Sequence, residues 1–507
     1  MTSASRGTGA LLGVAAAGSG LAVSELVSGI LHQRVSPLVA VAETIIRLTP
    51  GALIEPVISL VGRNDKPLLV VLTIVGLAVV SALTGVLALR SLAAAEGVFV
   101  AMGVVLVLSV HARLTASTGT YIPALVGIAV AVVVLAWLTP YAVRSTARDR
   151  PADVRDTGRR QFLHYAAGAS AAALLLGATG RLLAHGRAAL DTARRRLRLP
   201  VTAPAEPRGA DLGVSGITSW VTDQEDFYRI DTAISIPQIL PAEWTLRIHG
   251  KVDRELTLTY QDLVDRGITE YWLTLCCVSN EVGGDLISNA WWSGVPIADL
   301  LADAGVQSGA DAVLSTSDDG WTCGTPLDAL TDDRKALLAV AMNGEPLTPE
   351  HGFPVRMVVP GLYGYVSATK WVVEMKVTTF AEDMGYWTPL GWSALGPIKI
   401  GSRIDTPRKN AAQAGRVTVA GVAWAQHLGI AKVEVQVDQG AWRVAELADT
   451  VGPDTWRQWK YDWDATAGDH TLSVRATGTD GTTQTDDQAP PEPDGATGWH
   501  TINIKVA

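Results

Sequence analysis

Five long apolar runs in the first 185 residues constrain the fold of this chain more than any other feature of its sequence. A helix that crosses a bilayer needs about 20 apolar residues, because the hydrocarbon core is about 30 Å thick. Runs close to that length occupy residues 10–31, 68–89, 93–112, 119–139 and 163–180. The sequence therefore predicts an all-α transmembrane domain over residues 1–185.

The segment 38–61 is apolar but interrupted by charge. It carries Glu43, Arg47 and Glu55, and Pro50-Gly51 lies in its middle. Such a segment can span the membrane with a kink, or lie as a re-entrant or interfacial helix. Its charged side chains fit a solvated or bundle-facing surface, and a proton or ion pathway is the alternative.

A basic loop separates the last two apolar runs, and the positive-inside rule places such a loop in the cytoplasm. Its arginines are Arg144, Arg148, Arg150, Arg155, Arg159 and Arg160. Residues 158–163 read Gly-Arg-Arg-Gln-Phe-Leu and precede an apolar run, which resembles a twin-arginine export signal, an address read by a receptor. Two further positive-inside arginines are the alternative. With either five or six spans the rest of the chain lies outside the cytoplasm, so we expect a multi-pass cell-membrane protein with an extracytoplasmic catalytic domain.

The chain changes character after the apolar runs. Arginines between residues 181 and 198 are unexpected on an exported flank, and a juxtamembrane helix on anionic headgroups would explain them. The composition of residues 186–216, rich in Pro, Ala and Gly toward its end, indicates a linker. The sequence beyond it is acidic and Trp-rich, and the net charge of −9 argues against a nucleic-acid partner.

An apolar run later in the chain ends in two adjacent thiols. Residues 273–278 read Leu-Thr-Leu-Cys-Cys-Val and lead into a polar turn that contains Gly283-Gly284. A thiolate at the end of a strand is suited to a soft metal, whereas a buried cysteine that acts as a small hydrophobe is the alternative. The only other cysteine is Cys323, and three cysteines with one adjacent pair do not make a disulfide framework.

A second set of motifs follows the cysteines. Residues 342–347 read Met-Asn-Gly-Glu-Pro-Leu, and residues 351–356 read His-Gly-Phe-Pro-Val-Arg. Val-Val-Pro-Gly at 358–361 and Lys-Trp at 370–371 come next. Together with Cys-x-x-Asn at 277–280, this order resembles the sulfite oxidase family of molybdopterin enzymes, in a membrane-anchored form of actinobacterial type.

The resemblance begins near Thr218 and continues to the C-terminus. It implies an α+β molybdopterin-binding oxidoreductase domain over residues 217–410, with the molybdenum cofactor. Residues 411–507 show short alternating strands at 417–424, 430–437, 442–447, 456–463 and 471–476, a pattern that predicts an immunoglobulin-like β-sandwich. In the family the corresponding domain pairs subunits, which implies a homodimer.

The resemblance also assigns roles to individual residues. Cys277, rather than Cys276, matches the cysteine that binds the metal, and alternation along a strand turns Cys276 to the opposite face. Tyr228 and Arg229 would position the substrate beside Cys277 as catalytic residues. The implied cofactor-binding residues are Phe227, Tyr228, Arg229, Cys277, Asn280, Asp318, His351, Arg356, Ser367, Thr369 and Lys370. The alternatives are a surface ion pair for Arg229, a hairpin turn for residues 315–321, and a solvated side chain for Lys370.

Three positions depart from the sulfite oxidases. Glu281 and Val340 stand where those enzymes place an arginine and a tyrosine, and residues 491–493 replace the region of a further arginine. A carboxylate in the pocket would repel a dianion such as sulfite. We therefore expect oxygen-atom transfer on an S-oxide, an N-oxide or protein methionine sulfoxide, while sulfite oxidation and a non-catalytic, membrane-anchored binding module are the alternatives.

The expected reaction needs an electron-transfer partner, which the sequence does not identify. His111 and His32 lie near the spans, and two histidines are thin support for a haem or quinone site. Anchoring in the membrane is therefore the preferred role of the N-terminal half.

Overall fold

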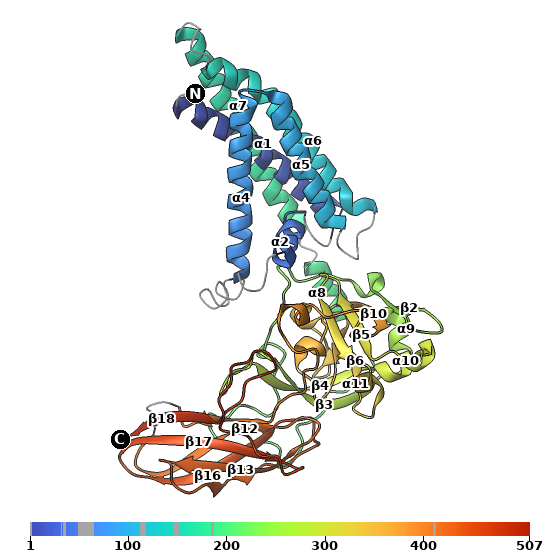
Figure 1. Ribbon diagram of the computed structural model, residues 1–507, viewed down its shortest axis with the longest axis vertical. Helices are drawn as coiled ribbons and strands as arrows, with labels where there is room; N and C mark the ends of the chain where they lie inside the picture. Colours follow the sequence, from blue (N-terminus) through green and yellow to red (C-terminus); the bar gives the residue numbers. More distant parts are fainter. Residues whose placement is uncertain are drawn as a thin grey trace. The chain divides into compact units, whose positions relative to one another are not determined.

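The computed structural model describes residues 3–31, 33, 37–48, 65–111, 118–146, 152–183, 187–408 and 412–507. The chain forms two compact units (Figure 1). The first unit is helical and comprises Met1–Thr192 with Ala233–Gln238. The second comprises Ala193–Thr232 with Ile239–Ala507 and contains all the strands of the described chain.

The helical unit is a bundle in which α1 packs against α4, α6 and α7. Its long helices are α1 (Ser3–Ile30), α4 (Asp65–Ala88), α5 (Leu92–His111), α6 (Ile122–Thr146) and α7 (Ala152–Leu183). Each contains a segment long and apolar enough to cross a membrane, and these five segments coincide with the five apolar runs of the sequence. Helix α7 begins well before its apolar run, because the helical hydrogen bonds continue into the polar residues that precede it.

Small residues bring the helices of this bundle into close contact. A side chain at Gly13 of α1 would lie 1.7 Å from the Ser81 carbonyl oxygen of α4, and one at Gly85 would lie 2.1 Å from the Gly9 carbonyl oxygen. Gly9 and Gly13 are one helical turn apart, as are Ser81 and Gly85, so each helix offers two small residues on one face. Such spacing lets the backbones of two helices approach closely. It is typical of helices in membranes, whose association depends on van der Waals packing rather than on the hydrophobic effect.

The segment 38–61 is described only in part. Helix α2 (Pro37–Leu48) covers its beginning, and twelve residues of helix extend about 18 Å, less than a hydrocarbon core. Glu43 is buried on α2, as the bundle-facing interpretation predicts. Glu55 and Pro50-Gly51 lie outside the described residues, as do Arg148, Arg150 and His32 in other segments.

The segment expected as a linker is partly helical and otherwise attached to the second unit. Helix α8 (Arg187–Arg196) occupies its start. The Thr202 amide and hydroxyl donate to the Glu270 carboxylate at 2.9 and 2.8 Å, and the Leu212 amide donates to the Gln458 side chain at 2.7 Å. Residues 197–216 are therefore an extended strap, fixed by hydrogen bonds that a sequence pattern does not reveal.

Two sheets form the central α+β part of the second unit. The first is mixed, in the order β2-β1-β10-β5-β6, and the second is antiparallel, in the order β3-β4-β7-β8 with β9 paired to β7. Short helices α9 (Tyr260–Val264), α10 (Ile297–Ala304) and α11 (Asp328–Thr331) connect the strands. The strands are β1 (Thr245–Gly250), β2 (Leu256–Thr259), β3 (Thr269–Cys276), β4 (Ile287–Pro296), β5 (Ala312–Ser317), β6 (Thr322–Pro326), β7 (Leu337–Met342), β8 (Glu345–Pro346), β9 (Arg356–Val358) and β10 (Val372–Thr378).

The C-terminal part is a β-sandwich of two antiparallel sheets, in the orders β11-β12-β16-β15 and β14-β13-β17-β18. Its core contains Trp459, Val433 and Leu472, and alternate residues of the strands face it. The immunoglobulin-like prediction is confirmed, although the strand expected at 442–447 is divided in two. The strands are β11 (Gly401–Thr406), β12 (Gly415–Trp424), β13 (Ile430–Val437), β14 (Arg443–Val444), β15 (Glu446–Leu447), β16 (Arg457–Ala465), β17 (Gly468–Gly478) and β18 (His500–Val506).

Candidate active site

The two adjacent cysteines at the end of β3 face different cavities. Cys277 lines a pocket of about 160 Å³, whereas Cys276 lines a cavity of about 30 Å³ together with Tyr363 and Trp424. Side chains alternate along a strand, and this alternation separates the two thiols as the sequence predicts. All three cysteines are buried and free, and Cys323 lies beside Thr325 in the interior.

Segments far apart in the sequence converge on the Cys277 pocket. The lining residues come from four segments: residues 227–232 without Arg229, the turn after β3, the β5–β6 hairpin, and part of residues 364–371. Its walls are largely aromatic, and they include Tyr228, Trp321, Tyr365, Trp387 and Trp392. The rings of Trp387 and Trp392 meet edge to face with centroids 6.3 Å apart. The pocket is therefore apolar on its walls and polar only at a few points.

Opposing effects act on the Cys277 thiol, and burial outweighs the others. Burial, the largest effect, raises the pKa of the Cys277 thiol. Hydrogen bonds from the Ser279 amide and hydroxyl and the positive charge of Lys370 act in the opposite direction and lower that pKa. A soft metal cation bound at the sulfur would remove the remaining penalty, because a coordinating thiol is deprotonated by its metal.

Two buried cations lie at the same pocket. Burial lowers the pKa of Arg356 to about 10, so its guanidinium is charged at neutral pH. Its hydrogen bonds within the described chain go to the carbonyl oxygens of Met357 and His351, at 3.4 and 3.3 Å, and no carboxylate pairs with it there. A buried guanidinium without a carboxylate is suited to an anionic ligand.

Lys370 differs from Arg356 because a carboxylate neutralises it. Its ammonium donates to Asp231 at 3.1 Å and to the Glu350 carbonyl oxygen at 3.0 Å, and burial lowers its pKa to about 8. The same Asp231 oxygen accepts from Arg229 Nε at 2.8 Å. Asp231 lines the pocket, whereas Arg229 does not and is 40% exposed. The position of Arg229 therefore matches the surface ion pair given as the alternative, with Asp231 as its partner.

His351 and Tyr228 are both neutral at physiological pH. Burial and the nearby Lys370 and Arg356 lower the pKa of His351 to about 3. Its Nε2 donates to the Gln224 carbonyl oxygen at 2.8 Å, which leaves Nδ1 as an acceptor. Burial, and then the two neighbouring cysteines, raise the pKa of Tyr228, so its hydroxyl stays protonated and can donate.

Several buried polar atoms at this site have no hydrogen-bond partner within the described residues. They are Ser317 Oγ and Trp321 Nε1, which belong to residues lining the pocket, and His351 Nδ1. Buried polar groups are rarely left unsatisfied, so these atoms indicate a polar ligand. A cofactor with a phosphate, a polar ring system and a soft metal matches the donor set of Arg356, Lys370, His351 and Cys277.

Not every residue expected at the cofactor lies at the pocket. Phe227, Tyr228, Cys277, Arg356 and Lys370 line it. The other expected side chains are used within the fold. Asn280 Oδ1 accepts from the Leu286 amide at 2.9 Å, and the Ser367 hydroxyl donates to the carbonyl oxygens of Leu362 and Tyr363.

The side chains of two more expected cofactor-binding residues are also not part of the pocket lining. The Thr369 hydroxyl shares a hydrogen bond of 2.7 Å with Ser315. Asp318 is buried in the β5–β6 turn, and its neighbour Asp319 lines the pocket instead. A one-residue shift in a hairpin changes the direction of the side chain, and the sequence alone does not fix that shift.

The positions used to argue against sulfite also lie elsewhere. Glu281 lines the small Cys276 cavity, and Val340 is fully buried on β7. Neither belongs to the Cys277 pocket. Glu281 therefore does not meet the expectation that it repels a dianion at the metal. Asp231, for which no role was expected, lines the pocket and pairs with Lys370.

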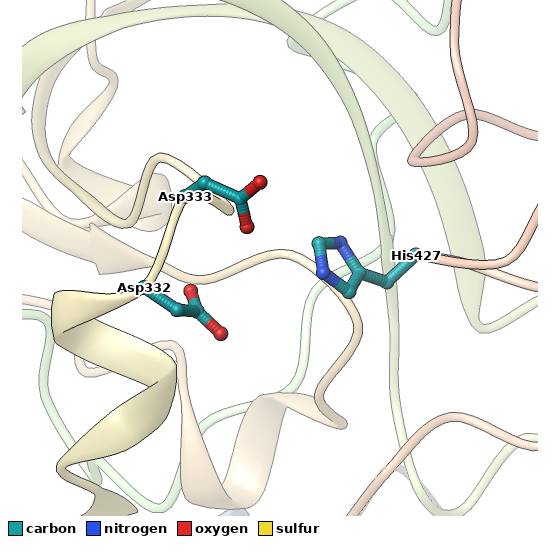
Figure 2. A group of neighbouring side chains, drawn as sticks. All are labelled: Asp332, Asp333 and His427. Atoms are coloured by element: carbon teal, nitrogen blue, oxygen red, sulfur yellow. The ribbon is translucent and has the colours of Figure 1, made fainter.

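Asp332, Asp333 and His427 form another group with metal-ligand chemistry in the described chain, and their ligand atoms lie within 4.8 Å of one another. Figure 2 shows the three side chains converging from the turn after α11 and the loop after β12. Arg334 binds the Asp332 carboxylate at 2.7 Å, and Asp454 lies 3.4 Å from His427. Arg334 and Asp454 already contact two of these three exposed residues, so we assign no metal to this group.

Comparison with known proteins agrees with this geometry. The family of the oxidoreductase molybdopterin binding domain matches residues 233–387, and the bacterial Ig domain matches residues 402–474. The fold and the site define the protein as a molybdopterin-dependent oxidoreductase, which implies the molybdenum cofactor.

Three similar proteins make the class more specific. The uncharacterized oxidoreductase YuiH of Bacillus subtilis (strain 168) is 37% identical over 154 residues, which are 30% of this chain and 74% of YuiH. Human mitochondrial sulfite oxidase is 28% identical over 289 residues, 48% of this chain and 53% of the human protein. The structure also resembles the crystal structure of the sulfane dehydrogenase SoxCD from Paracoccus pantotrophus, with a TM-score of 0.51 and 22% sequence identity. The match covers 57% of this chain and 82% of the SoxCD chain, and it shows a shared fold.

The chain belongs to the sulfite oxidase family of molybdopterin oxidoreductases. It spans about half the length of the human sulfite oxidase that it matches.

Proposed function

We propose that this protein is a membrane-anchored, extracytoplasmic enzyme that transfers an oxygen atom to or from a small neutral substrate, an S-oxide or N-oxide or the corresponding reduced compound. The observation that carries this proposal is the Cys277 thiol in a pocket with aromatic walls, where Asp231 pairs with Lys370 and so neutralises a cation that would otherwise attract an anionic substrate.

The residues of the pocket divide into cofactor and substrate functions. Arg356, Lys370 and His351 would hold the phosphate and the polar ring system of the cofactor, and Cys277 would bind its metal. When bound, the molybdenum cofactor supplies two-electron oxygen-atom transfer. The protonated Tyr228 hydroxyl lines the same pocket and would donate a hydrogen bond to the oxygen of the substrate.

The balance of charge favours a neutral substrate over sulfite. Asp231 is 5% exposed and shares its carboxylate between Lys370 and Arg229, so neither cation is free to attract a dianion. Trp321, Trp387 and Trp392 supply apolar contact area suited to a thioether or sulfoxide side chain. Methionine sulfoxide, free or in a protein, has the required neutral oxide and a narrow apolar stem.

The membrane assignment is supported by the helical unit. Five of its helices could cross a bilayer, and the Gly-mediated contact of α1 with α4 is typical of membrane helices. His111 Nδ1 shares a hydrogen bond of 2.8 Å with the Tyr121 hydroxyl. Electrons would come from a separate partner, and the sandwich would pair two subunits.

The first test compares the two adjacent cysteines. We expect Cys277→Ala to lose the thiolate-to-molybdenum absorption band and at least about 99% of S-oxide reductase activity, because the metal loses its protein ligand. Cys276→Ala, its matched control, removes a buried thiol of the same strand outside the pocket and should keep both signals. Metal analysis and absorption spectroscopy of the purified, cofactor-loaded chain would measure them.

Two outcomes would contradict the proposal. If Cys276→Ala, and not Cys277→Ala, loses the band, the metal ligand is misassigned. If the wild-type enzyme oxidises sulfite faster than it reduces any neutral S-oxide or N-oxide, the substrate class is wrong even though the cofactor assignment stands.

A further inference from the structure

The turn that carries Cys277 is a closed loop. The Cys277 amide donates to the Leu286 carbonyl oxygen at 2.9 Å, which joins the two ends of the loop. Inside it, the Asn280 amide donates to the Cys277 carbonyl oxygen at 3.1 Å and the Gly284 amide donates to the Glu281 carbonyl oxygen at 2.9 Å. The position of the Cys277 thiol therefore depends on what holds residues 277–286 as a body.

Two residues of the C-terminal sandwich hold the far side of this loop, and we name Arg403 and His500 the loop clamp. Arg403 on β11 donates from Nη1 to the Gly284 carbonyl oxygen at 2.6 Å. The His500 ring at the start of β18 lies against Gly283, where a side chain would approach the ring within 2.4 Å. Gly283 also has a φ of +79°, so glycine is required there on two grounds.

The clamp is itself fixed and buried. Arg403 Nε donates to Asp405 at 2.6 Å and Nη2 donates to the Thr218 hydroxyl at 2.8 Å, so all three of these donors point in set directions. His500 Nδ1 accepts from the Ile404 amide at 2.9 Å, which ties the ring to the strand that carries Arg403. The side chains of Arg403 and Asp405 are 9% and 8% exposed.

The same sandwich also holds the strand that leads into the loop. Strand β3 is the edge strand of its sheet, and its outer edge is covered at Thr274, three residues before Cys277. The Thr274 amide donates to the Asp454 carbonyl oxygen at 3.0 Å, and the Trp456 amide donates to the Thr274 hydroxyl at 2.8 Å. The Gln426 side chain donates to the Thr274 carbonyl oxygen.

We infer that the C-terminal sandwich positions the metal-binding thiol, with Arg403 as the positioning residue of the loop clamp. Cys277 lies between two attachments to the sandwich, one at Thr274 and one at Gly283-Gly284. The domain therefore acts on the metal site within one chain, in addition to any pairing of subunits. This inference rests on the proposed role of Cys277 as the metal ligand.

The test uses the full-length enzyme, with and without cofactor. Arg403→Ala removes the clamp, and Arg403→Lys keeps the charge beside Asp405 but loses the fork that reaches Gly284 and Thr218 together. We expect hydrogen exchange in residues 277–286 to become at least about tenfold faster in both variants, with or without cofactor. In the loaded enzyme, the thiolate-to-molybdenum band and the Mo(V) paramagnetic resonance spectrum should shift.

Arg416→Ala is the matched control, because Arg416 is a sandwich arginine of β12 that pairs with Asp462 of β16 at 2.5 Å. It should leave loop exchange and both spectra unchanged, even where it lowers the melting temperature. Loss of molybdenum from an Arg403 variant that keeps the wild-type melting temperature also supports the inference.

Wild-type loop exchange and wild-type spectra in either folded Arg403 variant would overturn the inference. A fall in melting temperature with both readouts unchanged would overturn it too, because Arg403 would then only join the domains. If Cys277→Ala keeps the wild-type spectrum, the ligand assignment fails, while hydrogen exchange still decides whether the clamp orders the loop.

Discussion

At the residue scale, Asp231 sets the charge of the Cys277 pocket, because its buried carboxylate pairs with both Lys370 and Arg229. Cys277, Arg356 and Lys370 lie in stretches of distinctive sequence, and all three line the pocket. Asp231 carries no motif, and its pairing with Lys370 joins residues 139 positions apart. A contact of that kind depends on how the sheets pack, so a single sequence does not reveal it.

The role of Asp231 leads to a prediction about anions. Asp231→Asn should strengthen sulfate binding to the pocket at least about tenfold, because Lys370 and Arg229 would lose the charge that neutralises them. The constant for competitive inhibition of S-oxide turnover by sulfate would measure the change. Asp319→Asn is the control, since Asp319 lines the same pocket but accepts its hydrogen bond from the Trp321 amide.

A change of less than about threefold in Asp231→Asn, or an equal change in Asp319→Asn, would show that the ion pairs of Asp231 do not exclude anions. The melting temperature of both variants, measured alongside, separates a binding effect from unfolding.

At the scale of helices and strands, periodicity and composition predicted most of the architecture. The apolar runs are helices, and the alternating segments after residue 415 are strands of a sandwich. The ends of helices were less predictable where helical hydrogen bonds continue from an apolar run into polar residues. Helix α7, for example, begins in the polar residues that precede its apolar run. Segments without a pattern, such as the strap over residues 197–216, were taken as a linker because their partners lie far away in sequence.

The close crossing of α1 and α4 allows a second prediction. Gly13→Leu should destabilise the bundle by about 1–3 kcal/mol or more, because its side chain would collide with the backbone of α4. Gly18→Leu is the matched control on the same helix, since a side chain at Gly18 meets nothing within 4 Å. Denaturant unfolding of the full chain in detergent micelles would compare the two.

Equal stability of the Gly13 and Gly18 variants would mean that the α1–α4 crossing does not limit the stability of the bundle. A larger loss in Gly18→Leu would place the close contact on the opposite face of α1.

At the scale of the whole molecule, the proposed location requires that a cofactor enzyme be delivered to the outer side of a membrane. Arg159 and Arg160 are exposed near the start of α7, where a receptor could read them. We propose that this pair directs the export of the second unit after its folding, which a cofactor inserted in the cytoplasm would require.

Replacing both arginines tests this proposal. The double variant Arg159→Lys, Arg160→Lys should keep the second unit inside the cell, because a twin-arginine receptor discriminates against lysine. The orientation of the helices should not change, because lysine and arginine count equally in the positive-inside rule. Protease treatment of intact cells would digest the second unit in the wild type and spare it in the variant. The control replaces Arg195 and Arg196 of α8 by lysine, and its second unit should still be exported. If the protease digests the second unit of the Arg159/Arg160 variant at the wild-type rate, this pair is not an export signal.

The strap over residues 197–216 determines where a soluble form of this enzyme can begin. It supplies the hydroxyl and amide that Glu270 binds, the amide that Gln458 binds, and a residue that packs against Gly344 in the Met-Asn-Gly turn. Removing everything up to residue 216 would expose these partners and open one side of the catalytic unit to water. A cut between α7 and α8 would instead leave the strap in place and separate the helical bundle from an otherwise complete unit.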